Sequence, residues 1–86
     1  QNYPNPFNPT TVIEYYLRHG APVELAVYNL LGERVKTIIS EAQPAGWHTA
    51  TWDGNDNLGS PVASGVYLYQ LKAGDYIESR KMLLLR

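Results

Sequence analysis

The sequence has no cysteine, a single phenylalanine and no excess of charge of either sign. Without cysteine the chain has no disulfide, no thiolate metal site and no cysteine nucleophile. A formal net charge of −1, from 7 Lys and Arg against 8 Asp and Glu, leaves no basic stripe and argues against a nucleic-acid partner. No apolar run approaches the roughly 18 residues of a membrane-spanning helix, so we expect no such helix.

The length of the chain, 86 residues, is enough for one domain and too short for two cores. We therefore expect a single domain over 1–86, in which 1–10 form a proline-rich lead-in segment. A domain of this size buries only about 60–65% of its unfolded surface, so its stability margin should be small. Because the chain begins at Gln1 and shows no signal peptide, we expect it to be a piece of a longer protein whose export signal lies upstream.

Apolar side chains recur with the period of two residues that is typical of strands, and helical periodicity is missing. Turn-forming Gly, Asn, Asp and Pro interrupt this alternation about every ten residues. The pattern predicts an all-β fold, an Ig-like or fibronectin-III-like antiparallel β-sandwich of about seven strands, with a barrel as the alternative. The expected strands are 11–17, 23–28, 34–40, 47–52, one that opens at residue 65, and 76–85. The expected core residues are Phe7, Ile13, Tyr15, Leu17, Val23, Leu25, Val27, Val35, Ala50, Trp52, Tyr67, Tyr69 and Leu71.

The lead-in segment contains three prolines within six residues. Proline fixes φ and removes a backbone donor, so the segment cannot be a central strand and should be a stiff, extended ribbon. Such a ribbon is either a rigid linker or a docking segment, since proline-rich segments lose little entropy on binding. The residues that we assign to partner recognition in this ribbon are Pro4, Asn5, Pro6 and Phe7.

The last expected strand contains three leucines in succession, 83–85, which cannot all face one core because side chains alternate. At a sheet edge, its backbone could pair with a strand of a partner or, in a weak homodimer, of a second copy. The alternative is a strand buried on both sides, whose outer leucines meet a neighbouring domain. Lys81 and Arg86 flank the leucines and are either solvated gatekeepers against aggregation or partner contacts. We assign Lys81, Leu83, Leu85 and Arg86 to the recognition surface.

A weak calcium candidate lies in the loop that follows Trp52. Asp53, Asn55 and Asn57 have the spacing of the first ligands of a calcium loop. The glycine expected at the sixth position and the glutamate expected at the twelfth are missing. A turn built on Asx side chains explains the same residues without metal. We expect no other cofactor.

Four large rings, Tyr16, Tyr28, Trp47 and Tyr76, are predicted to face outward. Aligned exposed rings could stack on sugars, as in a carbohydrate-binding module, whereas cross-strand pairing is their ordinary role. No serine lies in a nucleophile-elbow pattern, and no carboxylate pair is flanked by other reactive groups. We therefore expect that the chain is not an enzyme.

Several landmark motifs follow one another along nearly the whole chain. They are 2–11 (NYPNPFNPTT), 27–32 (VYNLLG), 45–48 (AGWH), 52–54 (WDG), 62–71 (VASGVYLYQL) and 80–86 (RKMLLLR). In this order they resemble the C-terminal sorting domain, type A, of the bacterial type IX secretion system. They are also similar to an overlapping Ig-like family named after a flagellar hook-capping protein. The proline-rich opening and the Leu-Leu-Leu-Arg close favour the sorting domain.

This resemblance implies an Ig-like sandwich at the C-terminus of a larger cargo protein. The cargo would cross the inner membrane with a separate signal and pass through the periplasm. The outer-membrane translocon would then recognise the domain, and in many cargoes a sortase cuts ahead of it and attaches the cargo to the cell surface. The resemblance thus implies an exported protein, at the cell surface or outside the cell. The alternatives are a structural accessory module of an extracellular enzyme and a carbohydrate-binding module.

Overall fold

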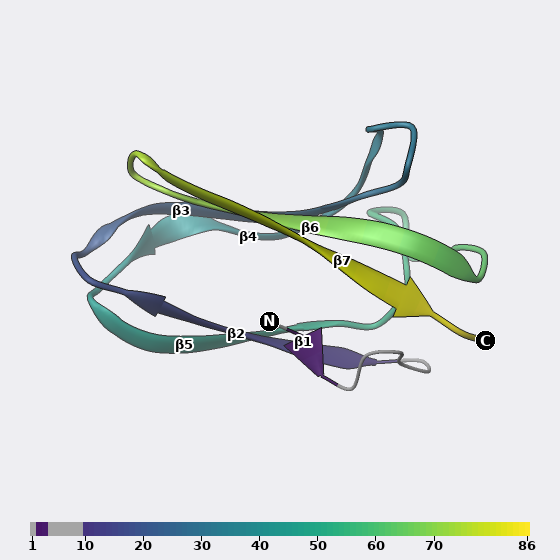
Figure 1. The fold of residues 1–86 in the computed structure, drawn as a ribbon, viewed down its shortest axis with the longest axis horizontal. Coiled ribbons are helices and arrows are strands. Elements are labelled where there is room, and N and C mark those ends of the chain that lie inside the picture. Colours follow the sequence, from purple (N-terminus) through teal and green to yellow (C-terminus); the bar gives the residue numbers. More distant parts are fainter. Residues whose placement is uncertain (1, 4–9) are drawn as a thin grey trace.

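A computed structural model of the chain describes residues 2–3 and 10–86. The regular structure in these ranges consists of strands, and no helix in them is long and apolar enough to cross a membrane (Figure 1). The all-β prediction is therefore confirmed. The strands are β1 (Asn2–Tyr3), β2 (Thr11–Leu17), β3 (Ala21–Tyr28), β4 (Arg34–Gln43), β5 (Gly46–Trp52), β6 (Gly65–Ala73) and β7 (Tyr76–Leu84).

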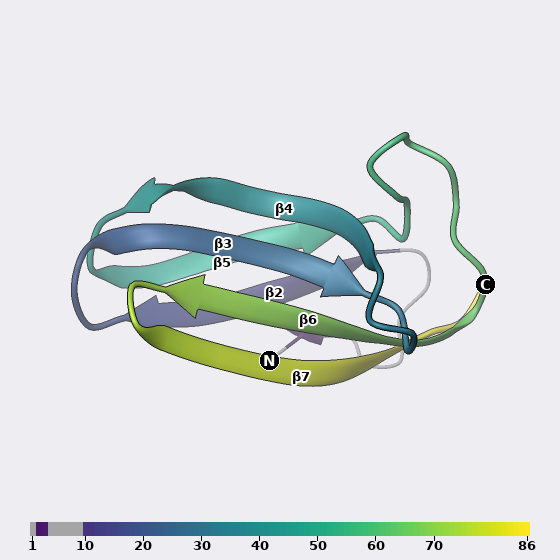
Figure 2. The same cartoon turned by 90° about the horizontal axis from the view of Figure 1, so that it is seen from above.

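The strands form two layers that face each other across the core, as the side view in Figure 1 and the top view in Figure 2 show. One sheet has the order β1-β2-β5, and the other has the order β4-β3-β6-β7. Each of these neighbouring pairs is antiparallel. The predicted antiparallel sandwich is thus confirmed. Strands β2 and β5 are neighbours in one sheet, although β3 and β4 of the other sheet lie between them in the sequence. Contacts between segments that are far apart along the chain therefore assemble both layers.

The inner faces of the two sheets form a single hydrophobic core. Every described position that the alternation predicts to be in the core is buried, except that Val35 is half-buried and packs against it. Phe7 lies outside the described residues. Met82 and Leu84 of β7 are also fully buried, although the alternation did not predict them. A run of consecutive apolar residues has no alternation of its own, so it does not show which members face inward.

Two buried tyrosines on β6 differ in whether their hydroxyl groups have a partner. The Tyr67 hydroxyl donates to the Ala63 carbonyl oxygen at 2.6 Å. The Tyr69 hydroxyl is buried without a hydrogen-bond partner in the described part of the chain. Burial raises the pKa of Tyr69 to about 12. Tyr67 and Tyr69 therefore allow a direct comparison of a buried hydroxyl that has a hydrogen-bond partner with one that has none among the described residues.

We expect Tyr69→Phe to raise the free energy of unfolding by about 1 kcal/mol, because it removes a buried polar group that lacks a partner. Tyr67→Phe should lower the free energy of unfolding by about 1 kcal/mol, because the Ala63 carbonyl oxygen loses its donor. Urea unfolding at pH 7, followed by circular dichroism, measures both. Equal effects of the two substitutions would contradict this account.

Candidate functional site

Strand β7 lies at the edge of the four-stranded sheet, where it pairs with β6 alone among the described strands (Figure 2). The sequence left open whether this strand lies at an edge, and the structure places it there. The β6–β7 register runs without a shift from Gly65 opposite Leu84 to Ala73 opposite Tyr76. A regular edge strand offers its outer backbone groups to another strand, which is the basis of strand addition.

The three successive leucines are divided between the two sides of β7. Leu84 is fully buried, whereas Leu83 is 37% exposed and Leu85, just beyond the strand, is 46% exposed. Lys81 is also exposed and lies opposite Leu68 on the outer face. Three of the predicted recognition residues, Lys81, Leu83 and Leu85, are thus exposed at one end of the edge strand. Leu84 instead anchors this strand to the core.

The inner side of β7 carries a row of polar groups at its solvent-exposed rim. The Tyr76 hydroxyl donates to Glu78 Oε2 at 2.8 Å, and Arg80 Nε donates to Glu78 Oε1 at 3.3 Å. The bond from Tyr76 contributes most, and together with the bond from Arg80 it holds the pKa of Glu78 below its usual value. The stabilisation that comes with ionised Glu78 is therefore present above the pKa of an unfolded glutamate and is lost as the pH falls through the lowered value. Sequence reasoning did not select Glu78 or Arg80.

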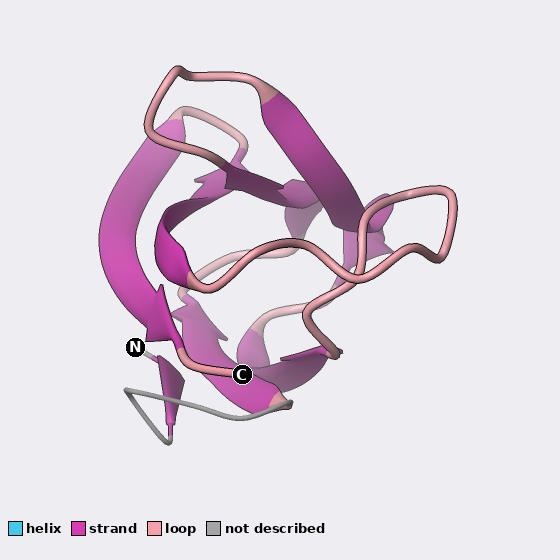
Figure 3. Ribbon diagram, turned by 90° about the vertical axis from the view of Figure 1, so that its right-hand side faces the viewer, coloured by secondary structure: helices cyan, strands magenta, loops and turns pink. Residues whose placement is uncertain are grey.

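Arg86 is held against the loop between β5 and β6. Its backbone N–H donates to Ser64 Oγ at 2.9 Å, and Nε donates to the Val62 carbonyl oxygen at 2.6 Å. Its Nη2 also donates to the Gly54 carbonyl oxygen. Figure 3 shows the C-terminus beside the loops at this end of the sandwich. Arg86 is exposed, and its guanidinium also donates to backbone carbonyl groups of this loop. Its roles as a gatekeeper or as a partner contact stay predictions.

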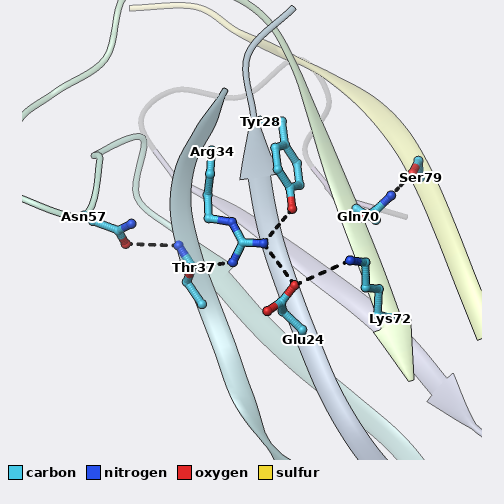
Figure 4. Close-up of polar contacts among 8 residues, drawn as sticks. All are labelled: Glu24, Tyr28, Arg34, Thr37, Asn57, Gln70, Lys72 and Ser79. Atoms are coloured by element: carbon cyan, nitrogen blue, oxygen red, sulfur yellow. Dashed lines mark hydrogen bonds and ion pairs between the residues drawn. The ribbon is translucent and has the colours of Figure 1, made fainter. Parts of the chain in front are cut away.

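The same loop contains the weak calcium candidate, and its polar side chains accept hydrogen bonds from nearby N–H groups. Asp53 Oδ1 accepts the Asn55 backbone N–H at 3.0 Å, and Asn57 Oδ1 accepts the Thr37 N–H at 3.0 Å. The second of these bonds joins the loop to β4 (Figure 4). No group of three or more His, Cys, Asp or Glu that could hold a metal occurs in 2–3 and 10–86. Calcium binding by Asp53, Asn55 and Asn57 stays a prediction.

The middle of the outer face of the four-stranded sheet is occupied by its own polar contacts (Figure 4). Arg34 Nη2 contacts Glu24 Oε1 at 3.1 Å and donates to the Tyr28 hydroxyl at 2.9 Å. Lys72 Nζ lies 4.0 Å from the same Glu24 oxygen. The exposed cations of this region are therefore paired within the domain, whereas no ion pair is recorded for Lys81 with any described residue.

The four rings do not form one flat row. Tyr16 and Trp47 are cross-strand partners on the three-stranded sheet, with ring centroids 5.3 Å apart and planes 58° apart. Trp47 is 73% exposed, so its outward position is confirmed. Tyr28 and Tyr76 belong to the other sheet, and Tyr28 is half-buried beneath Arg34. Stacking on a sugar needs coplanar rings, which this arrangement lacks.

The other part of the predicted recognition surface, Pro4, Asn5, Pro6 and Phe7, lies outside the described residues. Its role as a ribbon stays a prediction. The described part of the predicted site is therefore the exposed end of β7, together with Leu85. Arg86 lies next to it and contacts the loop.

Comparisons with known proteins show which family and which solved structures the chain is similar to. The model of the FlgD Ig-like domain family matches residues 8–76, which is most of the chain. A search of curated proteins found no match. Several solved structures are similar, PorU, PorZ and FlgD among them. PorU from Porphyromonas gingivalis, described as a dimeric latent form, has a TM-score of 0.78 and 16% identity over 99% of this chain and 9% of its own.

PorZ, an essential surface component of the type-IX secretion system of Porphyromonas gingivalis, has a TM-score of 0.70 and 17% identity over 100% of this chain and 11% of its own. FlgD from Xanthomonas campestris, described through its role in hook capping, has a TM-score of 0.68 and 21% identity over 92% of this chain and 58% of its own. At these identities the structures show a shared fold. The chain spans about a tenth of PorU and PorZ. Their alignments include β7, whereas the family match ends at residue 76.

Proposed function

This chain belongs to the FlgD Ig-like domain family, and within that family we propose that it is the C-terminal sorting domain of a larger exported protein, recognised by the outer-membrane machinery of type IX secretion. The observation that carries the proposal is the regular edge strand β7 with Lys81, Leu83 and Leu85 exposed. This strand lies almost entirely beyond the family match. The fold similarity to PorZ, a surface component of that system, supports the same function.

The mechanism in this proposal is protein recognition without chemistry in the domain. The translocon adds a strand to the outer edge of β7, where main-chain hydrogen bonds supply affinity. Lys81 and the outer leucines then supply specificity. A sortase acts ahead of the domain, and the cargo, which is the upstream part of the same protein, reaches the cell surface or the medium. The proline ribbon, 4–9, is a second contact in the same proposal.

A structural accessory module is the second candidate. The family match favours it, because that match does not extend into β7 and FlgD itself is described through hook capping. In that case the exposed leucines of β7 would contact a neighbouring domain of the same protein. The carbohydrate-binding alternative has less support, because the exposed rings are not coplanar.

The test is export of a reporter that carries 1–86 at its C-terminus, in a strain with type IX secretion and in one without it. We expect surface or secreted reporter in the competent strain alone. Lys81→Glu should lower that export about tenfold, because charge reversal of one recognition contact costs about 1.4 kcal/mol. Lys36→Glu, the same charge change on β4 at the other edge of the sheet, is the matched control and should leave export unchanged.

Arg86 is kept intact in this test because its substitution would also free the loop that it contacts. Urea unfolding of the purified variants checks that both are folded. Periplasmic retention of the folded parent reporter in both strains would replace the sorting proposal with the accessory module. Export of the Lys81→Glu reporter at the parent level would leave sorting in place and remove Lys81 from the recognition surface.

A further inference from the structure

The two edges of the four-stranded sheet differ in how well they are protected. Along β4 the register with β3 shifts between Leu25 and Ala26 and again between Val27 and Tyr28. Asn57 also covers this edge, because its N–H donates to the Val35 carbonyl oxygen and its side chain accepts the Thr37 N–H. Bulges and a covering loop are common means of blocking strand addition. One edge is thus closed.

Strand β7 has neither device among the described residues. Its nine pairs with β6 run in one unbroken register. No described strand or loop is hydrogen-bonded along its outer side in the way that Asn57 is on β4. Leu83, near the end of β7, has an interaction of its own, so the stretch considered for pairing is 76–82. This stretch is long and regular, which is the form that accepts a further strand.

The charges on β7 select among the ways in which a second β7 could pair with it. In an antiparallel pair of two β7 strands, side chains that lie opposite each other must point to the same face of the joined sheet. This holds for full overlap of the two strands and for shifts from it by an even number of residues. Full overlap of 76–84 places Arg80 opposite Arg80. A slide of two residues in one direction places Lys81 opposite Lys81. Both registers oppose like charges directly, which is destabilising.

A slide of two residues in the other direction has the opposite result. It places Ser79 opposite Ser79 and pairs 76–82 of one copy with 76–82 of the other. Glu78 of each copy then lies opposite Arg80 of the other, which makes two complementary pairs. Both residues lie at the solvent-exposed rim, where Arg80 Nε already bonds Glu78 Oε1 within the chain at 3.3 Å. The same charges that penalise other registers therefore favour this one.

We propose that a second copy of this chain pairs with β7 as an antiparallel strand, with Ser79 opposite Ser79 and two Glu78–Arg80 contacts between the copies. Pairing joins the two four-stranded sheets into one continuous sheet. It covers the edge that the proposed function gives to the translocon, so the two interactions exclude each other. The inference does not rest on that function, because it concerns the purified chain in solution.

The interaction should be weak and sensitive to salt. A single strand pair buries far less surface than the roughly 1,600 Å² of a standard interface, so we expect a dissociation constant on the order of 100 µM to 1 mM. Each new Glu78–Arg80 contact replaces part of a contact within the chain, which also limits the gain. Because the pairs lie at the rim, about 0.5 M salt should weaken association.

Charge exchange tests the register. Sedimentation velocity of the chain between about 10 µM and about 1 mM should show the mass rise from 9.7 kDa toward twice that value. Glu78→Arg alone and Arg80→Glu alone should each associate at least about tenfold more weakly, because like charges then lie opposite. An equal mixture of the two variants should associate again, since each copy then complements the other.

Two further variants complete the test. The double variant E78R/R80E keeps the opposite charges both within the chain and across the proposed pair, so it should associate like the parent. Glu41→Arg on β4 is the control and should leave association unchanged. Circular dichroism shows whether each variant is folded. A monomeric parent at about 1 mM, or a mixture that associates no better than its components, would overturn the proposal. Neither result depends on whether the reporter is exported.

Discussion

Replacing Trp52 by alanine is expected to lower the free energy of unfolding by about 3–5 kcal/mol, which is the usual cost of truncating a buried aromatic side chain. Trp52 is fully buried and packs edge-on against Tyr67, with ring centroids 5.4 Å apart. Its Nε1 also donates to the Asn55 carbonyl oxygen at 2.8 Å. The substitution therefore leaves a cavity in the core and an unpaired carbonyl group in the loop.

The other tryptophan of the chain supplies the matched control. Trp47 is 73% exposed and contacts Tyr16 across the strand pair. Trp47→Ala should therefore cost about 1 kcal/mol or less, which is the range of a single cross-strand pair. Urea unfolding followed by far-UV circular dichroism measures both variants without depending on the fluorescence of either ring. Equal losses of stability at the two positions would contradict the core that the structure assigns.

A domain of this length has a total stability at the low end of about 5–15 kcal/mol. Trp52→Ala should therefore bring the chain close to unfolding at 37 °C. The effect should extend into the loop after β5, because Asn55 loses its donor and Gly54 accepts bonds from both Val62 and Arg86. Hydrogen exchange should show this loop losing protection together with the core. The Trp-Asp-Gly landmark thus joins the core to the loop.

The second large effect concerns two adjacent leucines of β7. Leu84 is fully buried, whereas Leu83 is 37% exposed and lies opposite Val66 on the outer face. Leu84→Ala should lower the free energy of unfolding by about 2–4 kcal/mol, because it removes buried methyl groups and leaves a cavity. Leu83→Ala should lower it by about 1 kcal/mol or less, because most of the lost contact is at the surface.

These two substitutions also separate folding from recognition. In the reporter assay, Leu84→Ala should reduce export in proportion to the fraction of unfolded domain, which urea unfolding at the same temperature gives. Leu83→Ala should reduce export while the domain stays folded, because Leu83 belongs to the proposed recognition surface. If Leu84→Ala were as stable as Leu83→Ala, the assignment of Leu84 to the core and of Leu83 to the outer face would be wrong. Normal export of the folded Leu83→Ala reporter would remove Leu83 from the surface.

Much of the fold could be predicted from the sequence because strands show themselves locally. Ile13, Tyr15 and Leu17 lie at every second position of one strand, and the structure buries all three. The same spacing and burial hold for Tyr67, Tyr69 and Leu71 on β6. The alternation arises from the pleat of the backbone, so it needs no knowledge of the partner strand. The turns before and after these strands were equally visible from Gly, Asn and Pro.

The proposed recognition surface was only partly predictable. The sequence showed that the leucines 83–85 could not share one face, but it did not show which of them is buried. Arg86 was expected to be either a solvated gatekeeper or a partner contact, and neither expectation included its bond to the Val62 carbonyl oxygen. These contacts join residues more than twenty positions apart, and no local pattern of residue types predicts such a pairing.

The sequence by itself determined the strand content, the turns, most of the core and the absence of cysteine chemistry. The tertiary structure alone decided which strands lie at edges, and hence that Asn57 covers the β4 edge while β7 pairs with β6 alone among the described strands. It also decided that Glu78 and Arg80 lie side by side at the rim of the open edge. The physical reason is that the period of a strand is a property of its own backbone. Its neighbours depend instead on how distant segments pack over a shared core.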